Sequence, residues 1–227
     1  MTGSGRMAIS ARSCSTSGSR SSLRAVPTSR LEAFSDGVIA VAITLLVLNI
    51  EVPHPTEHTH LAQELGHMWP QYAAYAVSFI TIGIIWINHH AMIGRLRQPD
   101  HMILILNLLL LMFIAVLPFA TNLMATYLKE GRGDNLAAAV YAGAFLLMSI
   151  TFAGLNFHIL FPKAHLMAAE ISYERRRQII ARGLAGLVPY AVATALAAVS
   201  SYVTLAICAA IAFFYALPVA SGSEQPH

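Results

Sequence analysis

The chain has 227 residues, of which 56% are hydrophobic and 11% are charged, and its mean hydropathy is +0.61. Soluble domains carry about 25% charged residues, so this composition excludes an ordinary soluble protein and predicts an all-α protein that crosses the lipid bilayer several times. The net charge of +3 does not indicate nucleic-acid binding, because the basic residues lie in the N-terminal tail and in short loops, where they set membrane topology.

The chain divides by composition into a tail, an apolar domain and a second tail. Residues 1–28 are rich in Ser, Arg and Gly and lack apolar periodicity, so we expect a disordered cytoplasmic tail. A transmembrane domain is expected over residues 29–219, and a short C-terminal tail over residues 220–227. With about 20 residues as the length of one spanning helix, six spans are expected near residues 31–52, 71–94, 101–128, 135–160, 178–198 and 201–219.

Lys and Arg residues predict how the domain is oriented. They gather in the N-terminal tail, in the loop at residues 95–97 and in residues 163–182, and none occurs between Arg30 and Arg95. Segments rich in Lys and Arg stay in the cytoplasm, and these three segments alternate correctly for that. Because the number of expected spans is even, both termini are expected on the cytoplasmic side of the cell membrane.

Polar side chains occur at a similar depth in the first three expected spans, as judged from the rise of about 1.5 Å per helical residue. Buried polar groups in hydrocarbon need partners, so we expect these side chains to meet, with Arg30 at the edge of the cluster and Trp86 beside it. Asp36, one of these polar residues, could instead cap the N-terminus of the first helix. The expected cluster consists of Ser35, Asp36, Asn88, His89 or His90, and Asn107.

Two roles for this polar cluster stay open from the residues alone. It either fastens the first three helices together or uses its histidines as a proton relay or pH sensor. No metal site is expected, because the adjacent residues His89 and His90 point about 100° apart on a helix. No phosphate-binding loop, nucleophile elbow or metalloprotease motif occurs, so we expect neither an enzyme nor a cofactor. The histidines between the first two spans are expected to lie in a solvated loop; they are His54, His58, His60 and His67.

The first expected helix has one apolar stripe. At about 100° per residue, Val41, Thr44, Leu45 and Leu48 share one face, and Asp36 points roughly 140° away from Val41. Such a stripe is typical of a surface that faces lipid or another helix, so periodicity alone gives it no special role.

The residues around this stripe resemble a known family. The run Arg30-x-x-x-Phe34-Ser35-Asp36-Gly37 resembles the RxxxFSDG signature of the prokaryotic members of the transmembrane protein 175 family of potassium channels. The segments from Ser78 to His90 and from Asn107 to Phe119 are similar to that family as well. The resemblance covers about residues 29–127, and it covers the rest of the chain mainly through the number of helices.

The resemblance implies a homotetramer of six-helix subunits, in which the first helix of each subunit lines a central pore for monovalent cations. Rings of apolar side chains would form the constriction, here Val41, Leu45 and Leu48, and Thr44 would supply the selectivity hydroxyl. Asn49 stands where Asp is common in the family.

The resemblance also implies a packing role for the motif residues Arg30, Ser35 and Asp36. They would hold the pore helix against its neighbours through Trp86 and a histidine of the second span.

We therefore expect a potassium-permeable cation channel with potassium as the permeant ion. The alternative is a proton-coupled secondary transporter that uses Asp36 and His89 or His90 as its relay, although no inverted repeat or pair of broken helices supports it. A structural membrane protein without transport activity is a third possibility that the sequence leaves open.

Overall fold

The computed structural model describes residues 27–53, 60–168 and 170–217. The expected tails of residues 1–28 and 220–227 fall outside this part, except for residues 27 and 28, and so do His54 and His58. The described residues are helical apart from turns, loops and one isolated bridge between Leu96 and Met167. The elements are α1 (Thr28–Val47), α2 (Leu61–His67), α3 (Trp69–Ile93), α4 (His101–Glu130), α5 (Asp134–Leu160), the short 3-10 helix η1 (Ala164–Leu166), α6 (Tyr173–Leu196) and α7 (Ser201–Ala216).

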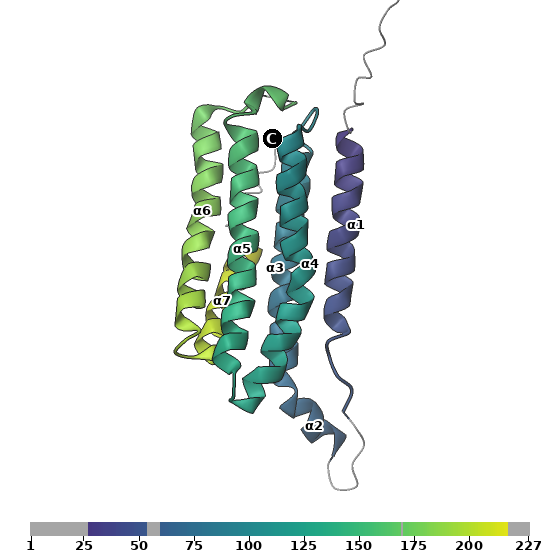
Figure 1. Cartoon of the computed structure of the whole chain (residues 1–227), viewed down its shortest axis with the longest axis vertical. Coiled ribbons are helices and arrows are strands. Elements are labelled where there is room, and N and C mark those ends of the chain that lie inside the picture. Colours follow the sequence, from purple (N-terminus) through teal and green to yellow (C-terminus); the bar gives the residue numbers. More distant parts are fainter. Residues whose placement is uncertain (1–26, 54–59, 169, 218–227) are drawn as a thin grey trace, which may run out of the picture.

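The long helices run side by side as a bundle (Figure 1). α1 lies at one edge and packs mainly on α3 and α4, whereas α6 lies at the other edge against α5 and α7. Tyr141 and Phe145 of α5 are the bulkiest fully buried side chains of the described core. The fold therefore leaves α1 as a peripheral helix that is covered on one side.

Four helices, α3 to α6, are long and apolar enough to cross a membrane. α7 is apolar but has only 16 residues, and α1 has 20 residues but includes Arg30, Glu32 and Asp36. The all-helical architecture with several apolar helices confirms the fold class at that level.

Residues at the helix ends explain where the helices begin and stop. Asp100 caps α4 by accepting a hydrogen bond from the Ile103 N–H at 2.8 Å, and Gly131 ends α4 in a left-handed conformation with φ of 65°. The sequence predicts a break at Ser200 and Ser201, and the structure has one: α6 ends at Leu196 and Ser200 caps α7.

The segment between α1 and α3 differs from the sequence prediction. Residues 61–67 form the helix α2, where a loop was predicted. His60 and His67 are exposed there, as expected for solvated side chains. A seven-residue helix is too short to be read from periodicity, because isolated helices of this length are marginal and depend on their surroundings.

Candidate functional site on the first helix

α1 has two faces of different character. The face toward α3 and α4 is buried and consists of Leu31, Ser35, Ile39, Ala42 and Leu46. The uncovered side carries the stripe predicted from the sequence: the exposed fractions are 57% for Val41, 42% for Leu45 and 74% for Leu48, and Thr44 is exposed as well. Leu48 is the C-cap residue, directly after the last residue of α1. A spanning helix that is apolar on its uncovered side can face either lipid or another subunit.

A buried chain of hydrogen bonds connects α1, α4 and α3. Ser35 Oγ donates to the Leu31 carbonyl at 2.8 Å and accepts from Asn107 Nδ2 at 3.0 Å. Asn107 Oδ1 lies 2.7 Å from His89 Nε2, and the three polar side chains are fully buried. Each step has a donor and an acceptor, so the network ties three helices together at one depth.

This network indicates which ring nitrogen of His89 carries a hydrogen. Because Asn107 uses its amide N–H on Ser35, its carbonyl oxygen accepts, and His89 Nε2 must carry the hydrogen. His89 Nδ1 is buried and has no partner among the described residues. A proton on Nδ1 would bury a charged N–H without an acceptor among the described residues, which costs more than an unpartnered ring nitrogen. The arrangement favours the fastening role over a proton relay.

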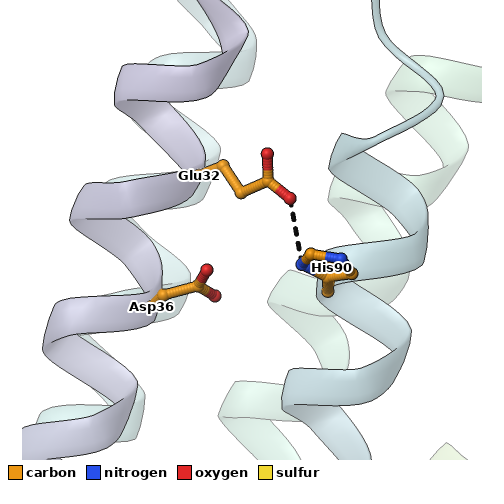
Figure 2. Close-up of side chains that lie close together, drawn as sticks. All are labelled: Glu32, Asp36 and His90. Atoms are coloured by element: carbon orange, nitrogen blue, oxygen red, sulfur yellow. Dashed lines mark ion pairs between the residues drawn. The ribbon is translucent and has the colours of Figure 1, made fainter.

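A second, less buried layer of contacts lies beside the first and also joins α1 to α3. Trp86 Nε1 donates to Asp36 Oδ1 at 2.9 Å, and His90 Nδ1 lies 2.9 Å from Glu32 Oε1. Figure 2 shows Glu32 and Asp36 projecting from α1 toward His90. The two carboxylates are four residues apart, which places them on one face of the helix.

These positions correct several expectations for individual residues. Asp36 does not cap α1, which begins at Thr28 after the N-cap Pro27. Neither His89 nor His90 pairs with Asp36, because the first contacts Asn107 and the second contacts Glu32.

Asn88 does not join the cluster. It donates to the Ile84 carbonyl of its own helix at 2.8 Å and lines a cavity between other helices. The motif residues Arg30, Phe34 and Gly37 are exposed, so within one subunit they take no part in the network.

The sequence prediction missed two residues that position α1. Glu32 lies one helical turn before Asp36, and that spacing was the available signal. Asn49, just after α1, donates from Nδ2 to the Pro118 carbonyl of α4 at 2.8 Å. This contact fastens the C-terminal end of α1, and nothing in the local sequence indicates it because the two residues are 69 positions apart.

The two carboxylates and His90 also present ligand atoms within 4.8 Å of one another, a spacing that a divalent cation accepts. Asp36 already accepts from the indole of Trp86, however, and Glu32 already pairs with His90. The contacts of these side chains are explained without an ion.

Comparison with known proteins places these features in a family. The family described as "Endosomal/lysosomal potassium channel TMEM175" matches residues 30–118. A protein of Streptomyces collinus that is named a potassium channel is 41% identical over 186 residues, which cover 82% of this chain and 90% of that protein. The chain belongs to the TMEM175 family. The resemblance stated from the sequence is therefore confirmed at the level of the family.

Other TMEM175 proteins show how far the similarity reaches. The crystal structure of a lysosomal potassium-selective channel TMEM175 homolog from Chamaesiphon minutus matches with a TM-score of 0.74 and 37% identity, over 83% of this chain and 96% of that chain. The endosomal/lysosomal proton channel TMEM175 of Gallus gallus is 38% identical over 119 residues, which are 49% of this chain and 24% of that protein. These relatives are named channels and not enzymes, in agreement with the sequence prediction, and the chain is a multi-pass membrane protein.

Proposed function

We propose that this chain forms a potassium-permeable cation channel in the cell membrane, with α1 of each subunit lining a central pore. Membership of the TMEM175 family and the names of its relatives support potassium as the permeant ion. The observation that carries the proposal is the exposed apolar stripe of Val41, Leu45 and Leu48, on a helix that is otherwise fastened by polar contacts.

The pore requires a homotetramer. Each subunit contributes six spans, which together form a channel domain over residues 29–219. α1 and α7 complete the six, because a helix with Glu32 and Asp36 can span when those carboxylates are partnered within the protein. Both termini then lie in the cytoplasm, together with Arg95 and Arg175, by the positive-inside rule.

The constriction arises from apolar side chains that meet around the tetramer axis. Four copies of Val41, Leu45 and Leu48 narrow the pore, and a narrow apolar segment closes it by excluding water. Thr44 contributes to selectivity. Its hydroxyl donates to the Val41 carbonyl at 2.9 Å, so the oxygen lone pairs are free to coordinate a potassium ion.

The polar contacts of α1 set the direction in which the stripe points. Ser35 and Asp36 hold the helix through Asn107 and Trp86, and Asn49 holds its other end. Arg30, Phe34 and Gly37 of the motif are exposed in one subunit, which makes them candidates for contacts between subunits.

Flux from liposomes that contain the purified protein tests the constriction. We expect potassium flux that follows the potassium gradient and responds to membrane potential. Leu45→Ala and Leu48→Ala remove apolar bulk from the constriction, so they should raise flux and reduce the preference for potassium over sodium. Val47→Ala is the matched control, since Val47 is also exposed on α1 but points about 120° away from Val41. Unchanged flux and selectivity in both leucine variants would remove the stripe from the pore.

The same liposomes separate the channel from a proton-coupled transporter. The Gallus gallus relative is named a proton channel, so proton movement is the property to test beside potassium flux. A protonophore should leave the potassium flux of a channel intact, because no proton gradient drives it. Flux that stops when the proton gradient is abolished would identify the transporter instead.

A further inference from the structure

A cavity of about 250 Å³ lies between α3, α5, α6 and α7, separate from the site on α1. Its volume is close to the lower end for small-molecule pockets, about 300 Å³. Asn88, which was predicted to join the cluster on α1, lines this cavity instead. The cavity therefore uses a polar side chain that the proposed pore does not.

The two ends of the cavity differ in chemistry. Arg95 and Arg175 line one end, beside the loop that follows α3 and the start of α6, and Arg182 lies two turns further along α6. Apolar and aromatic side chains line the wall beyond, among them Phe152 and Tyr190. From Met92 back to Thr81 the wall follows α3 for roughly 17 Å, at about 1.5 Å per residue.

The positive charge at the polar end is not compensated. None of the described residues that line the cavity is acidic, and the three ion pairs in the described part of the chain involve His90, His158 and Lys163 but no arginine. Partial burial lowers the pKa of the Arg95 guanidinium, and the nearby charge of Arg175 lowers it further. Two like charges that repel each other at the mouth of a cavity favour an anion between them.

We propose that this cavity binds an amphiphile with an anionic headgroup and an acyl chain. The guanidinium groups of Arg95 and Arg175 hold the phosphate or carboxylate, since Arg binds both in a bidentate manner. The apolar side chains of the wall contact the acyl chain. Basic pockets between spanning helices on the cytoplasmic side bind lipid headgroups in this way. The proposal does not rest on the channel function, because binding is measured without any flux.

Native mass spectrometry of the full-length protein in mild detergent tests the binding. Phosphatidylglycerol, phosphatidylcholine, oleate and glycerol 3-phosphate are titrated separately. We expect saturable binding of phosphatidylglycerol that is at least about tenfold tighter than that of phosphatidylcholine. Both lipids carry a phosphate, but the quaternary ammonium of choline makes that headgroup neutral overall and is repelled by the two arginines. Glycerol 3-phosphate should bind far more weakly, since it lacks the chain. Saturable binding of oleate as well would identify a fatty acid as a second natural source of the anionic amphiphile.

Arginine variants test the headgroup. Arg95→Gln and Arg175→Gln should each weaken phosphatidylglycerol binding about tenfold through the loss of one charge-assisted contact. Arg177→Gln is the matched control, because Arg177 is exposed on the same helix and does not line the cavity. It removes the same charge and should change the affinity by less than about twofold.

Gly183→Leu tests whether the acyl chain lies in the cavity, and the substitution should leave the fold intact. Gly183 lines the cavity, and a Cβ atom there would meet no heavy atom within 4 Å. Leucine also favours a helix more than glycine does. The added side chain should narrow the cavity and weaken phosphatidylglycerol binding at least about tenfold, without loss of thermal stability.

The proposal is overturned if phosphatidylcholine binds as tightly as phosphatidylglycerol, or if neither phosphatidylglycerol nor oleate binds in a saturable way. It is overturned as well if Arg177→Gln weakens binding as much as Arg95→Gln and Arg175→Gln do, because the charge effect would then be general. Full binding by Gly183→Leu would exclude the acyl chain from the cavity.

Discussion

Asn107 is the central residue of the buried network, because it bonds to both α1 and α3. Its amide donates to Ser35 and its carbonyl oxygen accepts from His89. Serine and histidine each depend on it, so the loss of one side chain leaves two buried polar groups to adjust. Asn107 of α4 thus fastens both α1 and α3 to its own helix. Its hydrogen bonds also fix the orientation of these helices, which apolar contacts alone would not.

Asn107→Ala should lower the free energy of unfolding by about 1–3 kcal/mol, since a buried His89 N–H loses its acceptor. Asn88→Ala is the control, because this asparagine is exposed and bonds only to its own helix, and its cost should stay below about 0.5 kcal/mol. Thermal unfolding in detergent compares the two. Equal destabilisation by the two variants would contradict the network.

At the scale of residues, the sequence predicted partners better than directions. Depth along a helix brought Ser35, His89 and Asn107 together correctly, because the rise per residue is fixed. The same argument placed Asn88 in the cluster wrongly. Depth carries no information on rotation about the helix axis, and one residue corresponds to about 100°.

The start of α4 shows how one side chain fixes both a helix and its neighbour. Asp100 accepts from the Ile103 N–H and lies 3.2 Å from Lys163 Nζ and 3.6 Å from His158 Nε2. Burial alone would raise the pKa of Asp100, but the hydrogen bond from Ile103 and the charge of Lys163 outweigh it and lower the pKa below the ordinary value of 3.8. The carboxylate therefore joins α4 to the segment after α5.

Asp100→Ala should cost about 1 kcal/mol of stability through the lost cap, and Asp100→Asn should cost less because asparagine still caps. The stability from the charge is complete well above pH 3.8 and is lost as the pH falls through the lower pKa of the folded protein. Thermal unfolding in detergent between pH 3 and pH 7, at about one-unit steps, should show the gap between wild type and Asp100→Asn closing only at the acid end. A gap that is constant in pH would contradict the ionised form as the stabilising one.

The helices themselves were the most predictable elements. Hydropathy gave α3, α4 and α5 with ends within a few residues, because a spanning helix must be apolar over its length. α6 begins at Tyr173, five residues before the predicted start, since its first turn is charged and hydropathy does not report it. The short helix α2 carries no such signal.

At the scale of the whole molecule, α1 is a peripheral helix that polar contacts fasten to α3 and α4. It lies at the edge of the bundle (Figure 1) and presents apolar side chains outward. The proposed tetramer would bury that side. A contact that orients α1 within one subunit should therefore influence assembly, although it does not itself lie between subunits.

Asp36→Ala and Trp86→Phe should each reduce the fraction of tetramer recovered in mild detergent, because each removes the hydrogen bond between α1 and α3. The double variant should lose no more than either single variant, since both changes break the same contact. Size-exclusion chromatography with light scattering measures the fraction. A normal tetramer with altered potassium flux in Asp36→Ala would instead give Asp36 a direct role in conduction.

The three consecutive residues Asn88, His89 and His90 of α3 have a consequence for the register of that helix. One lines the cavity, one meets α4 and one meets α1. The exposed apolar side chains of α3 would tolerate a turn of the helix about its own axis, but these three residues and the buried side chains of α3, such as Ile82, would not. A single residue inserted earlier in α3 would rotate all three by about 100° and separate each from its surroundings at once. Insertions and deletions in α3 should therefore be far less tolerated than substitutions of its exposed apolar residues.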